Sequence, residues 1–208
     1  MRPGPKVLMA LQEEVQGRLL AGCDLVVAGT VGDAGVCAVI EERQEVLRRF
    51  FSPGFLRGAS LLRENGERED LRKRAEAALL TAREKGSLCT LPLGEGGFLA
   101  GLWKVSLASE LGCEVDLRKV PIRQETIEIC EIFNLDPYGL FSEGSILCGT
   151  QRGAELCSAL RRKGIASMVI GNAKAGNDKL LFSASIRRYL DRPGPDELEK
   201  IRNQAGMV

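Results

Sequence analysis

The stretch "LCTLPLGEGGFLAGLWKVSLASELG", residues 88–112, places a glycine-rich turn between a short apolar run and a longer segment with helical spacing. This order predicts a tight turn that leads from the apolar run into a helix. The first amide groups of a helix have no partner within it, and glycines let an anion approach the backbone closely. The stretch therefore predicts either the frame of a phosphate site or a tight entry into a closely packed helix.

Helical and extended patterns alternate along the rest of the chain. Helices are predicted over residues 7–20, 41–51, 56–66, 67–86, 123–134 and 151–164. Apolar or β-branched runs predict strands over residues 25–28, 36–40, 113–122, 145–150, 166–173 and 179–190, and a hairpin-like turn at 174–178 joins the last two. We therefore expect an α/β or α+β layered domain in which helices flank a mixed sheet.

The chain divides into a main domain with two short appendages. Residues 1–21 are expected to contain an N-terminal helix, residues 22–190 the main domain, and residues 191–208 a Pro/Gly linker with a C-terminal tail helix. At 208 residues with 44% hydrophobic content, the chain can bury a substantial core.

The charge balance argues against two classes of partner. Twenty-nine basic residues against 28 acidic ones leave a net charge of +1, which supplies no field to recruit nucleic acid or an acidic membrane surface. No segment is long and apolar enough for a signal peptide or a membrane span. We expect a cytoplasmic protein that binds neither nucleic acid nor membrane.

The cysteine and histidine content restricts the chemistry. The 7 cysteines form no CxxC pair and the chain has no histidine, so no zinc or iron–sulfur site is expected. Several cysteines lie in apolar runs such as "GVCAVI", which favours buried reduced thiols over a redox role. Without histidine, triad hydrolysis and histidine phosphotransfer are excluded.

Three motifs in this order resemble the second domain of the aminoimidazole ribonucleotide synthetase superfamily. They are "GDAGVCAVI" (32–40), "LGEGGFLAGLWKVSLASELGCEVDLRKVPIRQETIEICEIFNLDP" (93–137) and "LFSEGSILCGT" (140–150). The resemblance runs from about residue 23 to 190 and is strongest to the hydrogenase-maturation type and its synthase-related relatives. It implies that the superfamily's first domain, which binds ATP and forms the dimer, is missing if Met1 is the natural start.

The resemblance also implies that the glycine turn has lost its reactive side chains. Relatives usually have His-Asp where Leu91 and Pro92 stand. Leucine transfers no proton and proline ligates no magnesium, so no catalytic residue is carried over. Glu95 either caps the helix or competes with a bound anion. The turn that remains consists of Gly94, Glu95, Gly96 and Gly97.

Two other loops contain candidate residues. Asp33 in "TVGDAGV" is expected to bond its own backbone, or else to line a second wall of a phosphate cleft, and no basic residue in that loop helps to hold charge. Glu143 in "FSEGS" is placed by the resemblance near the interface with the missing domain, although turn chemistry alone explains it. Trp103 is expected either in the core or at a hydrophobic spot that faces another domain, and surface positions are expected for Asp116, Arg118, Arg123 and Glu125.

These observations leave two classes of function. In the first, the domain is a binding or assembly module without catalysis of its own, and it needs no cofactor. In the second, it is half of a split ATP-dependent enzyme, so that ATP or phosphate with magnesium binds only in complex with a separate ATP-binding domain. No GxxxxGK[ST] loop occurs, which favours the first class. Self-association, or capping by the first helix, would cover the face that the first domain covers in relatives. We therefore expect a homodimer or higher oligomer, or else a complex with a separate ATP-binding domain protein.

Overall fold

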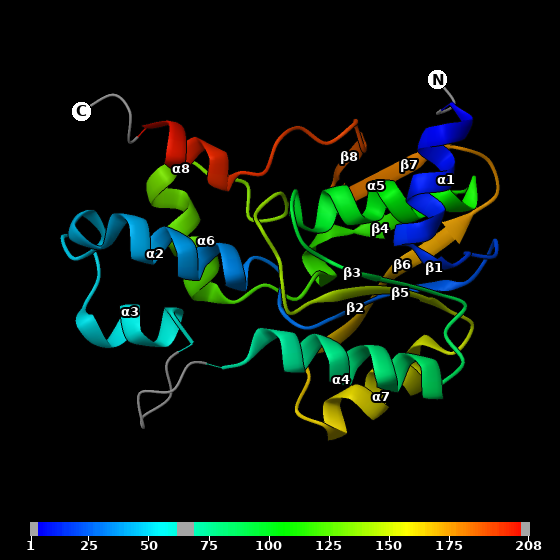
Figure 1. Ribbon diagram of the computed structural model, residues 1–208, viewed down its shortest axis with the longest axis horizontal. Helices are drawn as coiled ribbons and strands as arrows, with labels where there is room; N and C mark the ends of the chain where they lie inside the picture. The colour runs from blue at the N-terminus through cyan, green and yellow to red at the C-terminus, as the bar shows by residue number, and fades with distance from the viewer. Residues whose placement is uncertain (1–3, 62–68, 205–208) are drawn as a thin grey trace.

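The computed structural model describes residues 4–61 and 69–204, which form a mixed eight-stranded sheet between layers of helices (Figure 1). The strand order is β1-β3-β5-β2-β6-β4-β7-β8, and every pair is antiparallel except β4 with β7. The bounds are β1 Gln16–Gly17, β2 Asp24–Ala28, β3 Cys89–Pro92, β4 Gly112–Asp116, β5 Ile146–Thr150, β6 Ser167–Lys174, β7 Lys179–Ser183 and β8 Ile186–Tyr189. The predicted fold class is confirmed.

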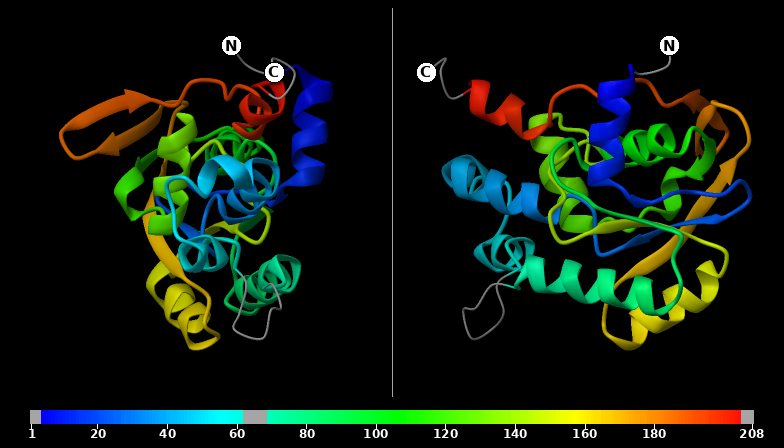
Figure 2. Two further views of the ribbon diagram at one scale, coloured as in Figure 1. Left: turned by 90° about the vertical axis from the view of Figure 1, so that its left-hand side faces the viewer. Right: turned by 45° about the vertical axis from the view of Figure 1, so that its right-hand side comes forward.

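Helices cover both faces of the sheet and form a lobe at one end (Figures 1 and 2). The first face carries α1 (Pro5–Glu14) and α5 (Gly97–Ser109), and the second carries α4 (Leu71–Glu84) and α7 (Gly153–Arg162). The lobe consists of α2 (Asp33–Leu47), α3 (Pro53–Ala59), α6 (Gln124–Phe133) and α8 (Leu198–Gln204), and a 3₁₀ turn η1 (Leu117–Lys119) follows β4.

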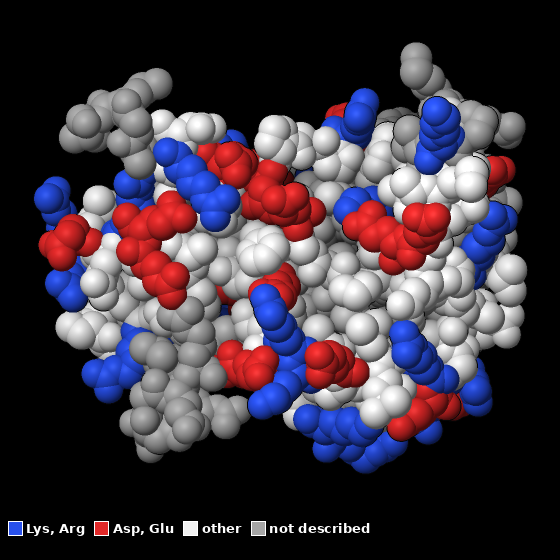
Figure 3. Space-filling view, in the orientation of Figure 1, with Lys and Arg blue, Asp and Glu red and all other residues white. Residues whose placement is uncertain are grey.

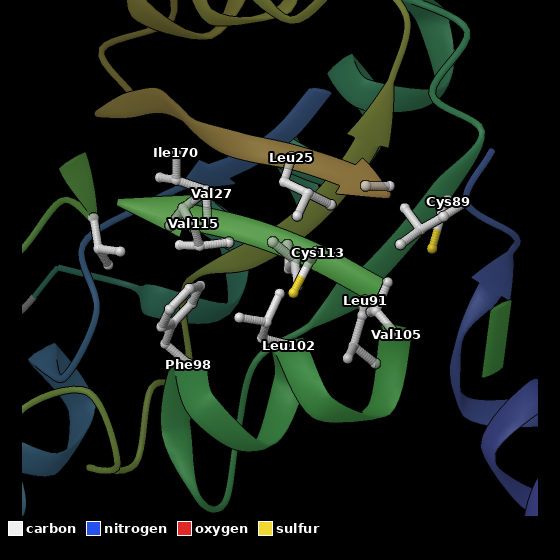
Figure 4. Packing of buried hydrophobic residues seen from close by; sticks show 14 of the residues in the cluster. Leu25, Val27, Cys89, Leu91, Phe98, Leu102, Val105, Cys113, Val115 and Ile170 are labelled. Carbon is white, nitrogen blue, oxygen red and sulfur yellow. The ribbon is translucent and has the colours of Figure 1, made fainter. Parts of the chain in front are cut away.

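The central strand β2 is buried on both faces from Leu25 to Ala28, and these four residues are all apolar. Leu25 and Val27 pack toward α5, whereas Val26 and Ala28 pack toward α4 and α7. Successive side chains of a strand point to opposite faces, and here both faces are covered. Figure 4 shows the larger of the two packing layers, in which α5 contributes Phe98, Leu102 and Val105.

The prediction of a strand at residues 36–40 is wrong, because these residues belong to α2. Gly32 has a φ of 82° and reverses the chain so that the helix begins at Asp33. Val36, Val39 and Ile40 are then buried together in the lobe at helical spacing. Tertiary packing has overridden the strand preference of β-branched residues.

The first helix is shorter than predicted. It ends at Glu14, and Gln16–Gly17 forms β1 against β3. Gly17 has a φ of +83°, and a Cβ there would lie 2.1 Å from the Leu88 carbonyl oxygen. The strand contact therefore requires glycine and stops the helix. Val15 and Leu19 are still buried, as the apolar pattern suggested.

The hairpin predicted across residues 174–178 is also wrong. β6 and β7 do not pair with each other, because β4 lies between them and runs parallel to β7. The hairpin in this region joins β7 to β8 and projects from the body of the domain (Figure 2). The strand predicted over 113–122 ends at Asp116, where η1 begins.

The remaining helices differ from prediction only at their ends. The helices predicted at 67–86, 123–134 and 151–164 are confirmed as α4, α6 and α7, and the helix at 41–51 continues α2 only to Leu47. The helix predicted at 56–66 starts earlier, at Pro53, because the Ser52 hydroxyl accepts a hydrogen bond from the Phe55 amide. Residues 62–66 of that prediction lie outside the described residues.

Candidate functional site

Ser142, in the connection before β5, forms hydrogen bonds to the loop before α2 and to the turn before α5. Its side chain is fully buried, its amide donates to the Gly94 carbonyl oxygen at 3.2 Å, and its hydroxyl oxygen accepts from the Gly32 amide at 2.9 Å. Ser145 adds a second link, because its hydroxyl donates to the Thr30 carbonyl oxygen at 2.9 Å. The loop before α2, the turn before α5 and the connection before β5 therefore meet at one corner of the domain.

Close packing explains the glycines of the turn before α5. Gly96 and Gly97 have φ values of 71° and 59°, in the left-handed region. A Cβ on Gly97 would lie 2.5 Å from the Leu140 carbonyl oxygen. Leu91 is buried in the core below α5, whereas Pro92 is exposed. The tight entry expected from the sequence is present, and neither Leu91 nor Pro92 offers a proton or a metal ligand.

A carboxylate from the C-terminal part of the chain lies on this turn. Asp196 accepts hydrogen bonds from the Gly96 amide through Oδ2 at 2.6 Å, and from the Phe141 and Leu198 amides through Oδ1 at 3.2 Å and 2.9 Å. The amides of Gly97 and Leu99 donate to backbone carbonyl groups. The start of α5 is thus occupied by an anion that belongs to the protein itself.

Sequence reasoning missed Asp196. An aspartate ahead of a short polar helix predicts an N-cap, and Asp196 does cap α8. Its second role at α5 connects positions 100 residues apart, and no local pattern indicates it. Glu95, which was considered as a cap of α5, is exposed, and within the described ranges its carboxylate has no hydrogen-bond partner.

A cavity of about 400 Å³ adjoins the turn. Its walls come from the start of α5, the end of β8 and the segment that leads to α8, and they carry both signs of charge. Residues that line it include Gly96, Leu99, Asp136, Arg188, Asp191, Arg192 and Lys200.

Asp33 is fully buried, and its carboxylate forms ion pairs with two arginines. The prediction that this carboxylate bonds its own backbone in a turn does not explain these two ion pairs. Arg74 donates to Oδ2 at 2.9 Å, Arg123 donates to Oδ1 at 3.1 Å, and the Thr30 hydroxyl donates to Oδ2. Neither arginine is near the loop in sequence, since Arg74 lies in α4 and Arg123 precedes α6. Removal of one partner from a buried ion pair leaves an uncompensated charge, which makes the cluster a structural anchor.

Arg74 and Arg123 also donate hydrogen bonds to backbone carbonyl groups at this corner of the domain. Arg74 donates through Nε to Gly144 at 3.0 Å, and Arg123 donates to Gly58 at 3.1 Å and Ala59 at 2.7 Å. Arg123 was expected on the surface, yet only 21% of its side chain is exposed. The cluster therefore joins α3, α4 and the start of α6 to the loop before α2.

Glu143 lies at the outer rim of this corner. It forms an ion pair with Arg72 of α4 at 3.0 Å, in which the Arg72 side chain is 81% exposed. Of the predicted residues, Asp33 and Glu143 thus face α4, and the turn 94–97 faces Asp196.

The cysteine thiols of the described residues are shielded from solvent. All 7 cysteines are buried, as predicted, and burial raises the pKa of Cys89 and of Cys130 to about 12. Among the described residues, no group of three or more Cys, Asp or Glu side chains is placed to hold a metal ion. Acidic and basic side chains are interspersed over the face that Figure 3 shows.

No helix within the described ranges is long and apolar enough to cross a membrane.

Comparison with known proteins relates this geometry to one family. The model of the AIR synthase related protein, C-terminal domain, matches residues 21–182. The carbamoyl dehydratase HypE of Rhodobacter capsulatus is 25% identical over 206 residues, which cover 95% of this chain and 56% of that protein.

Solved structures show the same fold. The crystal structure of E. coli HypE superposes with a TM-score of 0.67 at 23% identity, over 88% of this chain and 53% of that one. A crystal structure of HypE in complex with ATP gives a TM-score of 0.67 at 18% identity, over 88% of this chain and 54% of that one. The chain therefore spans about half the length of these relatives.

Proposed function

The chain belongs to the AIR synthase related protein family, as a C-terminal domain of that family, and from this premise we propose that the domain alone is a binding or assembly module without catalysis of its own. The observation that carries the proposal is the contact between Asp196 and the Gly96 amide at 2.6 Å. An incoming phosphate would have to displace a carboxylate held by three amides.

The side chains around the turn support the same conclusion. Leu91 is in the core and Pro92 has no titratable group, so neither position supplies an acid, a base or a magnesium ligand, and Glu95 is the only carboxylate within the turn 94–97. Asp33 is the one buried carboxylate at this corner, and its two arginines hold it in place. General acid–base catalysis needs a group within reach of the substrate, and a fully buried, doubly paired carboxylate does not meet that need.

Isothermal titration with ATP, with and without magnesium, tests the absence of catalysis. The chain alone should show neither saturable heat nor ATP hydrolysis, whereas the full-length HypE whose structure was solved in complex with ATP serves as the positive control for binding. Saturable ATP binding and turnover by this chain alone would overturn the proposal.

Assembly is the activity we assign to the module, either with itself or with a polypeptide that carries the family's other domain. The helix α1 packs on α5, and Glu14 forms an ion pair with Lys104 at 2.6 Å. Light scattering at two concentrations should reveal a species larger than the monomer. A monomer at both concentrations, together with no complex on addition of the other domain, would contradict assembly.

A second candidate is half of a split ATP-dependent enzyme. It is favoured by the match to 54% of a HypE chain whose structure contains ATP. In that case ATP binding should appear only when this chain is mixed with a polypeptide that supplies the ATP-binding domain. The same titration, repeated on the mixture and on each part, separates the two candidates.

A further inference from the structure

A second cavity, of about 290 Å³, lies between helix α1, the C-terminal half of α5 and the strands β7 and β8. Apolar and aromatic side chains form a large part of its wall, and they come from Leu8, Trp103, Leu107, Tyr189 and Leu190. Leu190 alone is shared with the cavity beside the turn before α5. The second cavity is therefore a separate place where a small molecule with an apolar body fits.

Lys179 is the polar residue that sets this cavity apart. It is the first residue of β7, and since side chains alternate along a strand, it shares a face with Leu181, which is buried in the core beneath α5. Lys179 is only 8% exposed, and its ammonium lies 5.1 Å from the centre of the Trp103 ring. The fold thus holds an amine in the apolar layer between the sheet and α5, at the wall of the cavity.

The amine of Lys179 has few partners in this position. Its Nζ donates one hydrogen bond, to the Asn177 carbonyl oxygen at 3.1 Å, although a lysine can donate three. Among the described residues, no carboxylate lies within ion-pair distance of Nζ, and lysines are rarely buried without such a pair. A molecule in the cavity therefore has access to an amine that the protein itself leaves largely unbonded.

Burial favours the neutral amine, which is the nucleophilic form of lysine. Removal from water lowers the pKa of Lys179, whereas negative charge at Cys113 or Asp178 acts in the opposite direction. Burial raises the pKa of the Cys113 thiol, which is therefore uncharged near neutral pH. Glu110 and Tyr189 also line the cavity, and both residues are exposed to solvent. A larger fraction of Lys179 than of a solvated lysine is consequently unprotonated.

We propose that Lys179 is a site of imine formation with a small aldehyde, whose apolar or aromatic body the cavity holds against Trp103 and Tyr189. The Nζ lone pair adds to the carbonyl carbon, and the carbon–oxygen bond then breaks. The oxygen leaves as water with the two amine protons, so the carbon–nitrogen double bond forms without oxidation or reduction. A proton from solvent gives the iminium, whose positive charge remains beside the Trp103 ring.

This inference goes beyond the proposed function and does not depend on it. Lys179 lines a different cavity from the turn 94–97, so ATP binding or turnover by the chain would overturn the proposed function and leave the imine site intact.

Reductive trapping on the unaltered chain tests the proposal. The protein is incubated at neutral pH with benzaldehyde and sodium cyanoborohydride, which adds hydride to an imine and leaves a stable secondary amine. Peptide mass spectrometry then gives the labelling rate of each lysine. Lys73, whose side chain is 81% exposed, is the internal reference, and Lys179 should be labelled at least about tenfold faster. Equal or slower labelling of Lys179 would overturn the inference.

A change of aldehyde tests the assigned ligand class. Glyceraldehyde has a polar body, so the rate at Lys179 relative to Lys73 should be several-fold lower with glyceraldehyde than with benzaldehyde. The relative rate corrects for the different intrinsic reactivity of the two aldehydes. The same relative rate with both would contradict recognition of an apolar body by this cavity.

A pair of variants on β8 tests the cavity wall. Tyr189→Ser removes an aromatic wall residue that is 59% exposed, and it should lower the relative rate with benzaldehyde several-fold. Arg187→Ser is the matched control, because Arg187 lies two residues earlier on the same strand and is not part of the cavity wall. Its relative rate should equal that of the unaltered chain. Equal rates in the two variants would overturn the placement of the aldehyde against Tyr189.

Discussion

Arg74 in α4 donates a hydrogen bond at 2.9 Å to Asp33, the first residue of α2, and the Asp33 side chain has no solvent exposure. The contact crosses from the layer below the sheet to the lobe at its end (Figure 1). Through this contact, the loop before α2 becomes part of a buried ion cluster. Loss of the contact should therefore lower the free energy of unfolding.

Arg74→Met should lower the free energy of unfolding by about 3 kcal/mol, because Asp33 keeps only one charged partner in a buried position. Arg72→Met, two residues earlier in the same helix, breaks the exposed pair with Glu143 and should cost at most about 1 kcal/mol. Urea unfolding of the two variants gives both values. Equal losses would show that burial of Asp33 does not matter for the strength of this contact.

Gly97→Ala should destabilise the domain by on the order of 2 kcal/mol or more, since alanine is strained at a φ of 59° and its Cβ would lie 2.5 Å from the Leu140 carbonyl oxygen. Gly58→Ala is the matched control. A Cβ at Gly58 meets no atom within 4 Å, so that variant should be neutral or stabilised by up to about 1 kcal/mol. Thermal unfolding compares the two, and a stable Gly97→Ala protein would contradict the packing role of the turn.

The cysteines should make stability fall at alkaline pH. Burial raises the pKa of Cys89 and of Cys130 from 9.0 to about 12 in the folded chain. Since the unfolded thiols ionise first, the folded state keeps its full advantage below pH 9, and loses it as the pH rises from 9 toward 12. Urea unfolding at successive pH values measures this decline.

Thiol reactivity gives an independent check on the same cysteines. Native protein at pH 8 should react slowly with iodoacetamide, whereas all 7 cysteines should react in denaturing urea. Rapid labelling of Cys89 or Cys130 in the native state would show that these thiols are accessible.

Lys179→Met should change the free energy of unfolding by less than about 1 kcal/mol. Lys179 is 8% exposed, its ammonium lies 5.1 Å from the centre of the Trp103 ring, and burial lowers its pKa. The lost cation–π contact, worth about 1–2 kcal/mol, is offset because an ammonium no longer has to leave water. A loss of several kcal/mol in urea unfolding would show that Lys179 is a necessary partner of Trp103.

The general architecture could be predicted because the spacing of apolar residues within a short segment is enough to identify a single helix or strand. The strand predicted at 25–28 and the helix predicted at 67–86 are confirmed, apart from the ends of the helix, and the turn 94–97 does lead into a helix. The strand predicted at 36–40 failed because the helix there depends on packing against α6 and α8, which are remote in sequence.

The contacts that decide the candidate site could not be predicted. Arg74 and Arg123 lie 41 and 90 residues after Asp33, and Asp196 lies 100 residues after Gly96. A single sequence shows which residue types occur in a loop but not which remote side chain enters it. The absence of a basic residue in the loop 29–35 therefore carried little information about its charge balance.

The sheet order also determines when this protein can fold during synthesis. Among the strands of the described residues, only β7 and β8 are neighbours both along the chain and in the sheet. The central strand β2, which leaves the ribosome early, pairs with residues 146–150 and 167–174, which leave it late. In nascent chains that end before residue 174, β2 therefore lacks one of its two partner strands, and the central part of the sheet forms only when synthesis is nearly finished.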